Sequence, residues 1–140
     1  MACLGRMRVL VVEDNEPVRH MIALLLRRNG FIALEAGNAA QAMAHFEKES
    51  PTIQLAIIDL MGTSGLDLAA EIDRDYRSTR ILYISGFVDS VAAEAIRRRS
   101  PETLLLKPFH ERALIDHVYR LVGEGQSAAA AKQGQRPERE

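Results

Sequence analysis

The chain has 140 residues, of which 47% are hydrophobic, and its formal net charge is -1. This length suits one domain and the apolar content suffices for a core, so two full domains and disorder throughout are excluded. Cys3 is the only cysteine, no apolar run approaches the roughly 18 residues of a membrane span, and the charge balance favours neither nucleic acid nor membrane as a partner, so we expect a cytoplasmic protein without disulfides.

Short apolar runs alternate along the chain with segments of helical periodicity. Arg8–Val12 is too short for a helix and entirely apolar after Arg8, which predicts a buried strand. Pro17 then lies in a first helical turn, and apolar residues recur at helical spacing until Gly30 ends the helix. The same patterns predict strands over residues 31–36, 55–58, 81–84 and 103–106, and helices over about 38–46, after Gly65, after Asp89 and before residue 123.

The strict alternation of strand and helix predicts the fold class. Five strand–helix pairs with short connections are typical of an α/β fold, a doubly wound, five-stranded parallel sheet with five helices. We expect residues 1–123 to form this domain. From Glu124 to Glu140, small residues, glutamine, glycine, proline and alternating charges replace the apolar period, which predicts a flexible C-terminal tail over 124–140.

Polar residues follow four of the five predicted strands. They are Glu13 and Asp14 after the first strand, Asp59 after the third, Ser85 after the fourth and Lys107 after the fifth. Since the carboxyl ends of parallel strands meet at one edge of the sheet, where ligands of such folds bind, we expect these side chains to converge. Each alone could be a helix cap, a turn residue or a solvated charge. Together, however, three carboxylates at one edge repel one another unless a cation joins them.

Oxygen ligands without histidine or thiolate favour Mg²⁺, which commonly shares its coordination sphere with a phosphate. Phosphoryl transfer needs a nucleophile, metal on the phosphoryl oxygens and a further cation or donor. Asp59 on the central strand would be the nucleophile and would form an acyl phosphate. Glu13 and Asp14 would hold the metal, while Lys107 and Ser85 would meet the phosphoryl oxygens.

In combination and in order, these motifs resemble those of the response-regulator receiver domains of two-component signalling, over residues of about 7–123. The resemblance implies the flavodoxin-like strand order 2-1-3-4-5. It also implies that Asp59 is the phosphoacceptor and that Lys107 pairs with the phosphoryl group while Ser85 moves to bond it. The implied Mg²⁺ ligands are Glu13, Asp14, Asp59 and the backbone carbonyl of Met61.

The resemblance carries three further expectations. The Lys107–Pro108 peptide is cis. The phosphodonor is a sensor histidine kinase or a histidine phosphotransfer protein. It docks over the first helix, near Asn15, Glu16, Arg19 and His20.

Two features depart from the family pattern. Asp59-Leu-Met-Gly-Thr-Ser-Gly65 is shorter than the usual loop and lacks its proline, and we expect a glycine to restore the turn. Leu104 stands where many receivers carry a tyrosine or phenylalanine that swings inward on activation. The output face, expected around the fourth helix, fifth strand and fifth helix, must then switch by another route.

We therefore expect a receiver that accepts a phosphoryl group on Asp59 in a Mg²⁺-dependent reaction and signals by protein–protein interaction, with no attached output domain and no catalysis beyond its own phosphorylation and dephosphorylation. The downstream target stays open, as does the choice between a stand-alone protein and a part of a hybrid kinase. The main alternative is a phosphorylation-independent pseudo-receiver. A phosphatase with an Asp-x-Asp motif is disfavoured by Met61, and a nucleotide-binding module by the acidic turn at Glu13–Glu16.

Overall fold

The computed structural model describes residues 7–49, 53–60, 64–86 and 90–131. Strands and helices alternate along the chain, as the hydrophobic pattern predicts. The elements are β1 (Arg8–Val12), α1 (Glu16–Arg28), β2 (Ile32–Ala36), α2 (Ala39–Glu49), β3 (Ile53–Asp59), α3 (Ser64–Asp75), β4 (Arg80–Ser85), α4 (Val91–Arg99), the short 3₁₀ helix η2 (Pro101–Thr103), β5 (Leu104–Leu106) and α5 (Glu111–Ala131).

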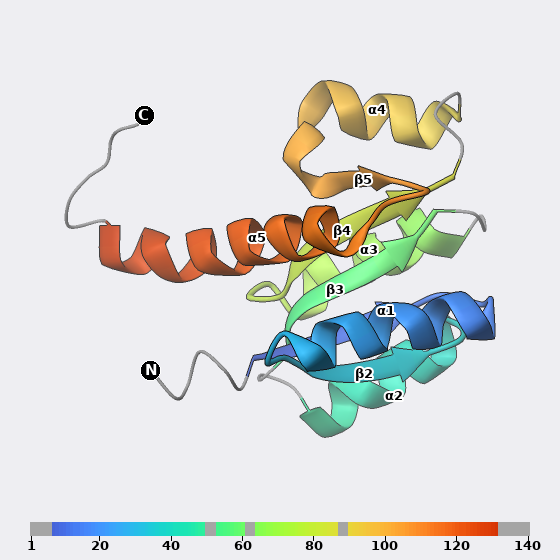
Figure 1. The fold of residues 1–140 in the computed structure, drawn as a ribbon, viewed down its shortest axis with the longest axis horizontal. Coiled ribbons are helices and arrows are strands. Elements are labelled where there is room, and N and C mark those ends of the chain that lie inside the picture. Colours follow the sequence, from blue (N-terminus) through green and yellow to red (C-terminus); the bar gives the residue numbers. More distant parts are fainter. Residues whose placement is uncertain (1–6, 50–52, 61–63, 87–89, 132–140) are drawn as a thin grey trace.

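The five strands form one parallel sheet in the order β2-β1-β3-β4-β5. Helices α1 and α5 lie on one face of this sheet and α2 and α3 on the other, while α4 lies beside the β5 edge (Figure 1). The predicted doubly wound α/β fold and its strand order are therefore confirmed. All five strands point the same way, which brings their carboxyl ends to one edge.

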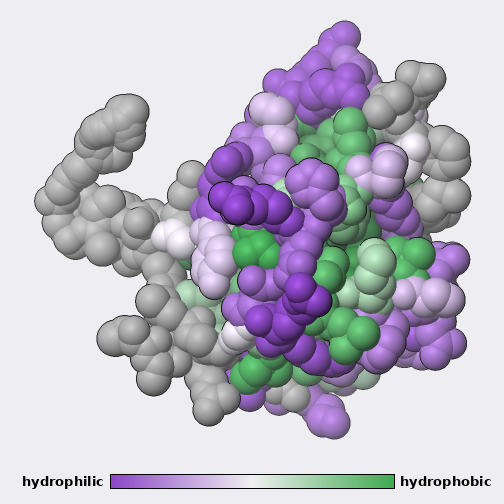
Figure 2. Space-filling model, in the orientation of Figure 1, coloured by the Kyte–Doolittle hydropathy of each residue, from purple (hydrophilic) through white to green (hydrophobic). Residues whose placement is uncertain are grey.

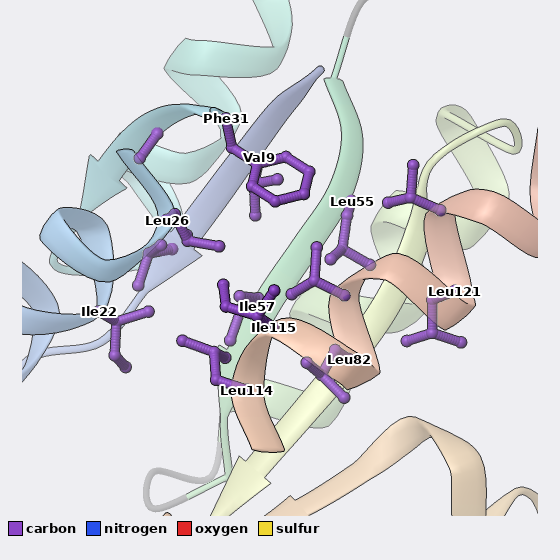
Figure 3. Close-up of a cluster of buried hydrophobic side chains, with 14 of the residues drawn as sticks. Val9, Ile22, Leu26, Phe31, Leu55, Ile57, Leu82, Leu114, Ile115 and Leu121 are labelled. Carbon is purple, nitrogen blue, oxygen red and sulfur yellow. The ribbon is translucent and has the colours of Figure 1, made fainter. Parts of the chain in front are cut away.

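Two hydrophobic clusters explain why the strands are mostly apolar. Leu55 and Ile57 of β3 belong to the cluster under α1 and α5, which Figure 3 shows, whereas Ala56 and Ile58 belong to the cluster under α2 and α3. Successive side chains of a strand point to opposite faces, and both faces are covered here. A one-residue slip of β3 would exchange the two sets, so the pattern also fixes the register.

Local signals define the ends of α1, the helix that follows the first acidic turn. The Asn15 side chain caps the helix by accepting a hydrogen bond from the Val18 amide (3.0 Å). Pro17 occupies the first turn, where its missing amide hydrogen costs nothing. Gly30 has φ of 94°, a left-handed conformation that suits glycine, and the chain turns there into β2. Local signals thus set both ends of α1, and Asn15 and Pro17 are the ones at the end that follows β1.

The structure differs from the sequence-based expectation at the C-terminal end. Helix α5 continues to Ala131, through residues for which the composition predicts a flexible tail from Glu124. Residues 128–131 are all alanine, the strongest helix former, and their helical preference leaves no apolar period to detect. The rest of the predicted tail, residues 132–140, lies outside the described residues.

Seen from the side of α1 and α5, the surface is largely hydrophilic with smaller hydrophobic areas (Figure 2). Met21 and Leu24 of α1 and Tyr119 of α5 are among the exposed large apolar side chains of the described residues. Within the ranges that the structure describes, no helix combines the length and the apolarity that crossing a membrane would need.

Candidate functional site

The carboxyl ends of β1, β3, β4 and β5 bring the predicted polar residues to one edge of the sheet. Glu13 directly follows β1, and Asp59 and Ser85 are the last residues of β3 and β4. Because β1 and β3 are neighbours, Glu13 and Asp14 meet Asp59 there. The three side chains each offer a carboxylate oxygen, and these oxygens lie within 4.8 Å of one another. The residues that the sequence places together are therefore close in space.

Lys107 reaches this acidic group from β5, on the far side of β4. Its Nζ lies 3.1 Å from Oε1 of Glu13 and 3.3 Å from Oδ2 of Asp59, so one ammonium group bridges two carboxylates. The Lys107 backbone amide donates to the Ser85 carbonyl (2.8 Å), and the peptide between Lys107 and Pro108 is cis, as expected. The buried Ser85 thereby lies next to the lysine that enters the site.

Burial acts on the pKa values of Glu13 and Lys107 in this cluster. The side chains of Glu13 and Asp59 are only 1% and 5% exposed, whereas Asp14 faces solvent. Burial and the neighbouring Asp59 carboxyl raise the pKa of Glu13 to about 7, against the opposing effects of the Asn15 amide and Lys107. Burial alone would lower the pKa of Lys107, but its bonds to Glu13 and the charge of Asp59 outweigh burial and raise that pKa.

The charge balance and the donor set fit a hard divalent cation. With all groups ionised, three carboxylates and one ammonium carry a net charge of -2. The candidate ligands are oxygens only, which is the set that Mg²⁺ prefers. A pocket of about 210 Å³ opens beside the carboxylates, between the β1 and β3 ends, the start of α2 and the start of α3. The cluster could therefore hold a metal and admit a phosphate-bearing partner.

Arg19 has a place in the site that the sequence did not reveal. Its Nη1 donates to the Glu13 carbonyl (3.0 Å), and its Nε donates to Oε1 of Glu35 on β2 (3.2 Å). Partial burial would raise the pKa of Glu35, but hydrogen bonds from His20 and Arg19 and the nearby Arg27 lower it. Arg19 thus ties the acidic turn after β1 to the neighbouring strand. The sequence contained one signal of this contact, because Glu35 is the single charged residue in the otherwise apolar strand β2.

Gly65 explains how the start of α3 fits beside the site. A Cβ at this position would lie 2.9 Å from the backbone oxygen of Asp59. Gly65 belongs to the helix itself, so its lack of a side chain permits close approach and does not serve a left-handed turn. Met61 and the rest of the shortened loop, residues 61–63, lie outside the described residues.

Replacing Gly65 by alanine should lower the free energy of unfolding by about 1–3 kcal/mol, because the new methyl group meets backbone that cannot move aside cheaply. Urea denaturation measures this change. The matched control is Gly123→Ala in α5, where a Cβ meets nothing within 4 Å and alanine should stabilise by up to about 1 kcal/mol. Changes of the same sign in the two variants would contradict the close approach of α3 to Asp59.

Comparison with known proteins places this site in a family. The sequence matches the response regulator receiver domain over residues 9–119. It is 33% identical over 131 residues to the phosphate regulon transcriptional regulatory protein PhoB of Pseudomonas aeruginosa, covering 90% of this chain and 57% of that protein. This chain spans about half the length of the first curated relatives that it matches.

Solved structures show the same fold. NtrX from Brucella abortus in complex with ADP superposes with a TM-score of 0.78 at 26% identity, over 88% of this chain and 28% of that one. A response regulator receiver domain protein from Clostridium thermocellum gives a TM-score of 0.77 at 20% identity, over 86% of this chain and 98% of that one. The family match and the shared fold together show that this chain belongs to the response regulator receiver domains of two-component signalling.

Proposed function

We propose that this receiver accepts a phosphoryl group on Asp59 from a phosphohistidine of a sensor kinase or phosphotransfer protein, and that the reaction requires Mg²⁺. The observation that carries the proposal is the bridging of the buried Glu13 and Asp59 by Lys107, beside a third carboxylate on Asp14. Two buried carboxylates at one strand edge serve no packing purpose, and phosphoryl transfer uses this combination of groups.

The chemistry follows from the placement of each group. An Oδ of Asp59 attacks the phosphorus, the bond between phosphorus and the donor histidine nitrogen breaks, and an aspartyl phosphate forms while the imidazole leaves. Lys107 Nζ, already 3.3 Å from Oδ2 of Asp59, pairs with the added negative charge. The Ser85 hydroxyl would donate to a phosphoryl oxygen.

The metal ligands in this proposal are Glu13, Asp14, Asp59 and the backbone carbonyl of Met61. Bound Mg²⁺ would supply charge neutralisation on the phosphoryl oxygens. The first three residues already bring carboxylate oxygens within 4.8 Å of one another, which supports the assignment. Met61 is included on family resemblance.

The phosphodonor would dock over the start of α1, where Asn15, Glu16 and His20 are exposed. Arg19 contributes less to this surface than the sequence suggests, because its guanidinium is engaged with Glu13 and Glu35. We place the protein in the cytoplasm, where it would signal through contacts with another protein. The phosphoryl group itself carries roughly -1.5 to -2 charges, so phosphorylation makes Asp59 more negative than its carboxylate and biases the surrounding surface.

The proposed activity can be tested without knowing the natural donor. The purified chain is incubated with acetyl phosphate and Mg²⁺, quenched rapidly and measured by intact mass spectrometry. A single phosphoryl adduct that forms with Mg²⁺ and not with excess EDTA supports the proposal. If neither acetyl phosphate nor a competent phosphohistidine domain gives an adduct, the alternative of a phosphorylation-independent pseudo-receiver replaces it.

Arg19→Ala should weaken Mg²⁺ binding roughly tenfold, because the acidic turn loses its tie to β2. Isothermal titration calorimetry measures the affinity directly. Arg28→Ala is the control, since Arg28 lies on the same helix but pairs with the distant Glu111. Equal Mg²⁺ affinity in the Arg19 variant and the wild type would show that the contact between Arg19 and the Glu13 carbonyl does not support the metal site.

A further inference from the structure

A second feature of the surface lies away from the phosphoacceptor edge, between α3 and α4. A groove of about 530 Å³ runs over β4 there, and a second pocket continues it along α4. The two share Leu66, Tyr83, Arg99, Ser100 and Thr103, so they form one surface, which we call the α3–α4 groove. In Figure 1, α4 stands beside β5, whereas α3 lies against β3.

Three arginines line this groove, and their guanidinium groups form no hydrogen bond or ion pair with any other residue that the structure describes. Most other arginines in the described ranges are engaged with a carboxylate, as in the pairs Arg74 with Asp75 and Arg97 with Glu94. Among the described residues, the guanidinium groups without such a contact are those of Arg77, Arg80, Arg99 and Arg120. All but Arg120 line the groove.

The groove is therefore positive on a chain that is slightly acidic overall. Asp73 is the one carboxylate among the described residues that line the groove. With three guanidinium groups, these residues carry a net charge of +2, while the whole chain carries -1. Asp73 forms no ion pair with any of the three arginines. Positive charges that line one groove raise the local concentration of anions and therefore favour the binding of an anionic partner.

Apolar side chains also line the groove, so the partner should present apolar groups as well as negative charge. Leu66 is 43% exposed at the rim, and Ala69, Ile81 and Tyr83 lie along the floor. Burial, with a smaller effect of Asp73, raises the pKa of the Tyr83 hydroxyl against the opposing charge of Arg99. Among the described lining residues Tyr83 is the one aromatic side chain, and it is partly buried, so these residues offer bases no stacking platform. An apolar floor between arginines instead suits a peptide segment.

We propose that the α3–α4 groove binds an acidic amphipathic segment of a partner protein. Apolar side chains of the segment would pack against Leu66, Tyr83 and Ile96, and its carboxylates would pair with Arg77, Arg80 and Arg99. The guanidinium forks are suited to carboxylates, and burial of part of each pair against the apolar floor strengthens the contact. The proposal concerns the unphosphorylated chain and does not depend on chemistry at Asp59.

The test uses a fluorescein-labelled helical peptide with glutamate on its polar face and leucine on its apolar face, titrated with the full chain and followed by fluorescence anisotropy. We expect saturable binding that weakens by at least about tenfold when Arg77, Arg80 and Arg99 are all changed to glutamate. The matched control changes Arg28, Arg112 and Arg120 to glutamate, which alters the net charge equally outside the groove. Its affinity should stay within about twofold of the wild type.

Two further variants keep the result interpretable. Changing Arg77, Arg80 and Arg99 to glutamine removes the charges without adding repulsion, and this variant should weaken binding severalfold. It replaces the glutamate variant if that protein does not fold. Leu66→Ser should weaken binding severalfold as well, because the segment loses an apolar contact at the rim.

Several outcomes would overturn the proposal. Equal weakening by the groove variant and the control variant would show a general charge effect. A peptide with alanine in place of leucine that binds equally well would show that the apolar floor is not used. A single-stranded oligonucleotide that binds more tightly than the peptide and is lost in the same groove variant would assign the surface to nucleic acid. Absence of saturable binding would remove the site altogether.

Discussion

Asp59→Asn should abolish formation of the phosphoryl adduct with acetyl phosphate, reducing the rate by at least about a hundredfold. The amide is a poor nucleophile and cannot form the acyl phosphate. Glu13 is also buried and also contacts Lys107, but Asp59 is the carboxylate of the cluster that ends the central strand β3. Rapid-quench intact mass spectrometry at several times gives the rate.

The matched control for this result is Asp67→Asn, which removes an exposed carboxylate from the first turn of α3. Its adduct should form at the wild-type rate. Circular dichroism of both variants should be unchanged, because Asp67 is exposed and because loss of the Asp59 charge relieves repulsion in the crowded cluster. An adduct on the Asp59 variant at more than a few per cent of the wild-type rate would assign the phosphoryl group to another residue.

Lys107→Ala should have two opposite effects. The rate of adduct formation at saturating Mg²⁺ should fall about a hundredfold, because the developing phosphoryl charge loses its positioned ammonium group. Mg²⁺ affinity, in contrast, should rise severalfold, since Lys107 Nζ now bonds to Glu13 and Asp59 and competes with the metal for their oxygens. Rapid-quench kinetics and calorimetry separate these two quantities.

Lys48→Ala is the control, because Lys48 is an exposed lysine at the end of α2. Neither its rate nor its Mg²⁺ affinity should change. A Lys107 variant that loses rate and Mg²⁺ affinity together would indicate that the lysine maintains the fold of the site. It would then have no specific role toward the phosphoryl group.

The sequence predicts the sheet well because its central strands, β1 and β3, are buried on both faces. Val9 and Leu10 of β1 belong to different clusters, so the apolar run has a direct structural cause. The convergence of Glu13, Asp59 and Lys107 also follows from topology, once parallel strands are inferred. The distances between these side chains could not be predicted from topology, because the position of the Lys107 side chain across β4 depends on packing between distant parts of the chain.

Other features depend on contacts between distant parts of the chain and could not be predicted. The bond of Arg19 to Glu35 joins α1 to β2, and the approach of Gly65 to Asp59 joins α3 to β3. A pattern of residue types along the chain shows neither. The end of α5 was missed for a different reason, since an alanine run favours a helix but gives no amphipathic period.

The most direct test of the central claim locates the phosphoryl group by chemistry. The chain is phosphorylated with acetyl phosphate and Mg²⁺, reduced with borohydride, which converts an aspartyl phosphate to homoserine and releases phosphate, and then digested and sequenced by mass spectrometry. We predict homoserine at position 59 and at no other aspartate. Homoserine at Asp14 or another residue, or an adduct that resists borohydride, would contradict the assignment of Asp59 as the phosphoacceptor.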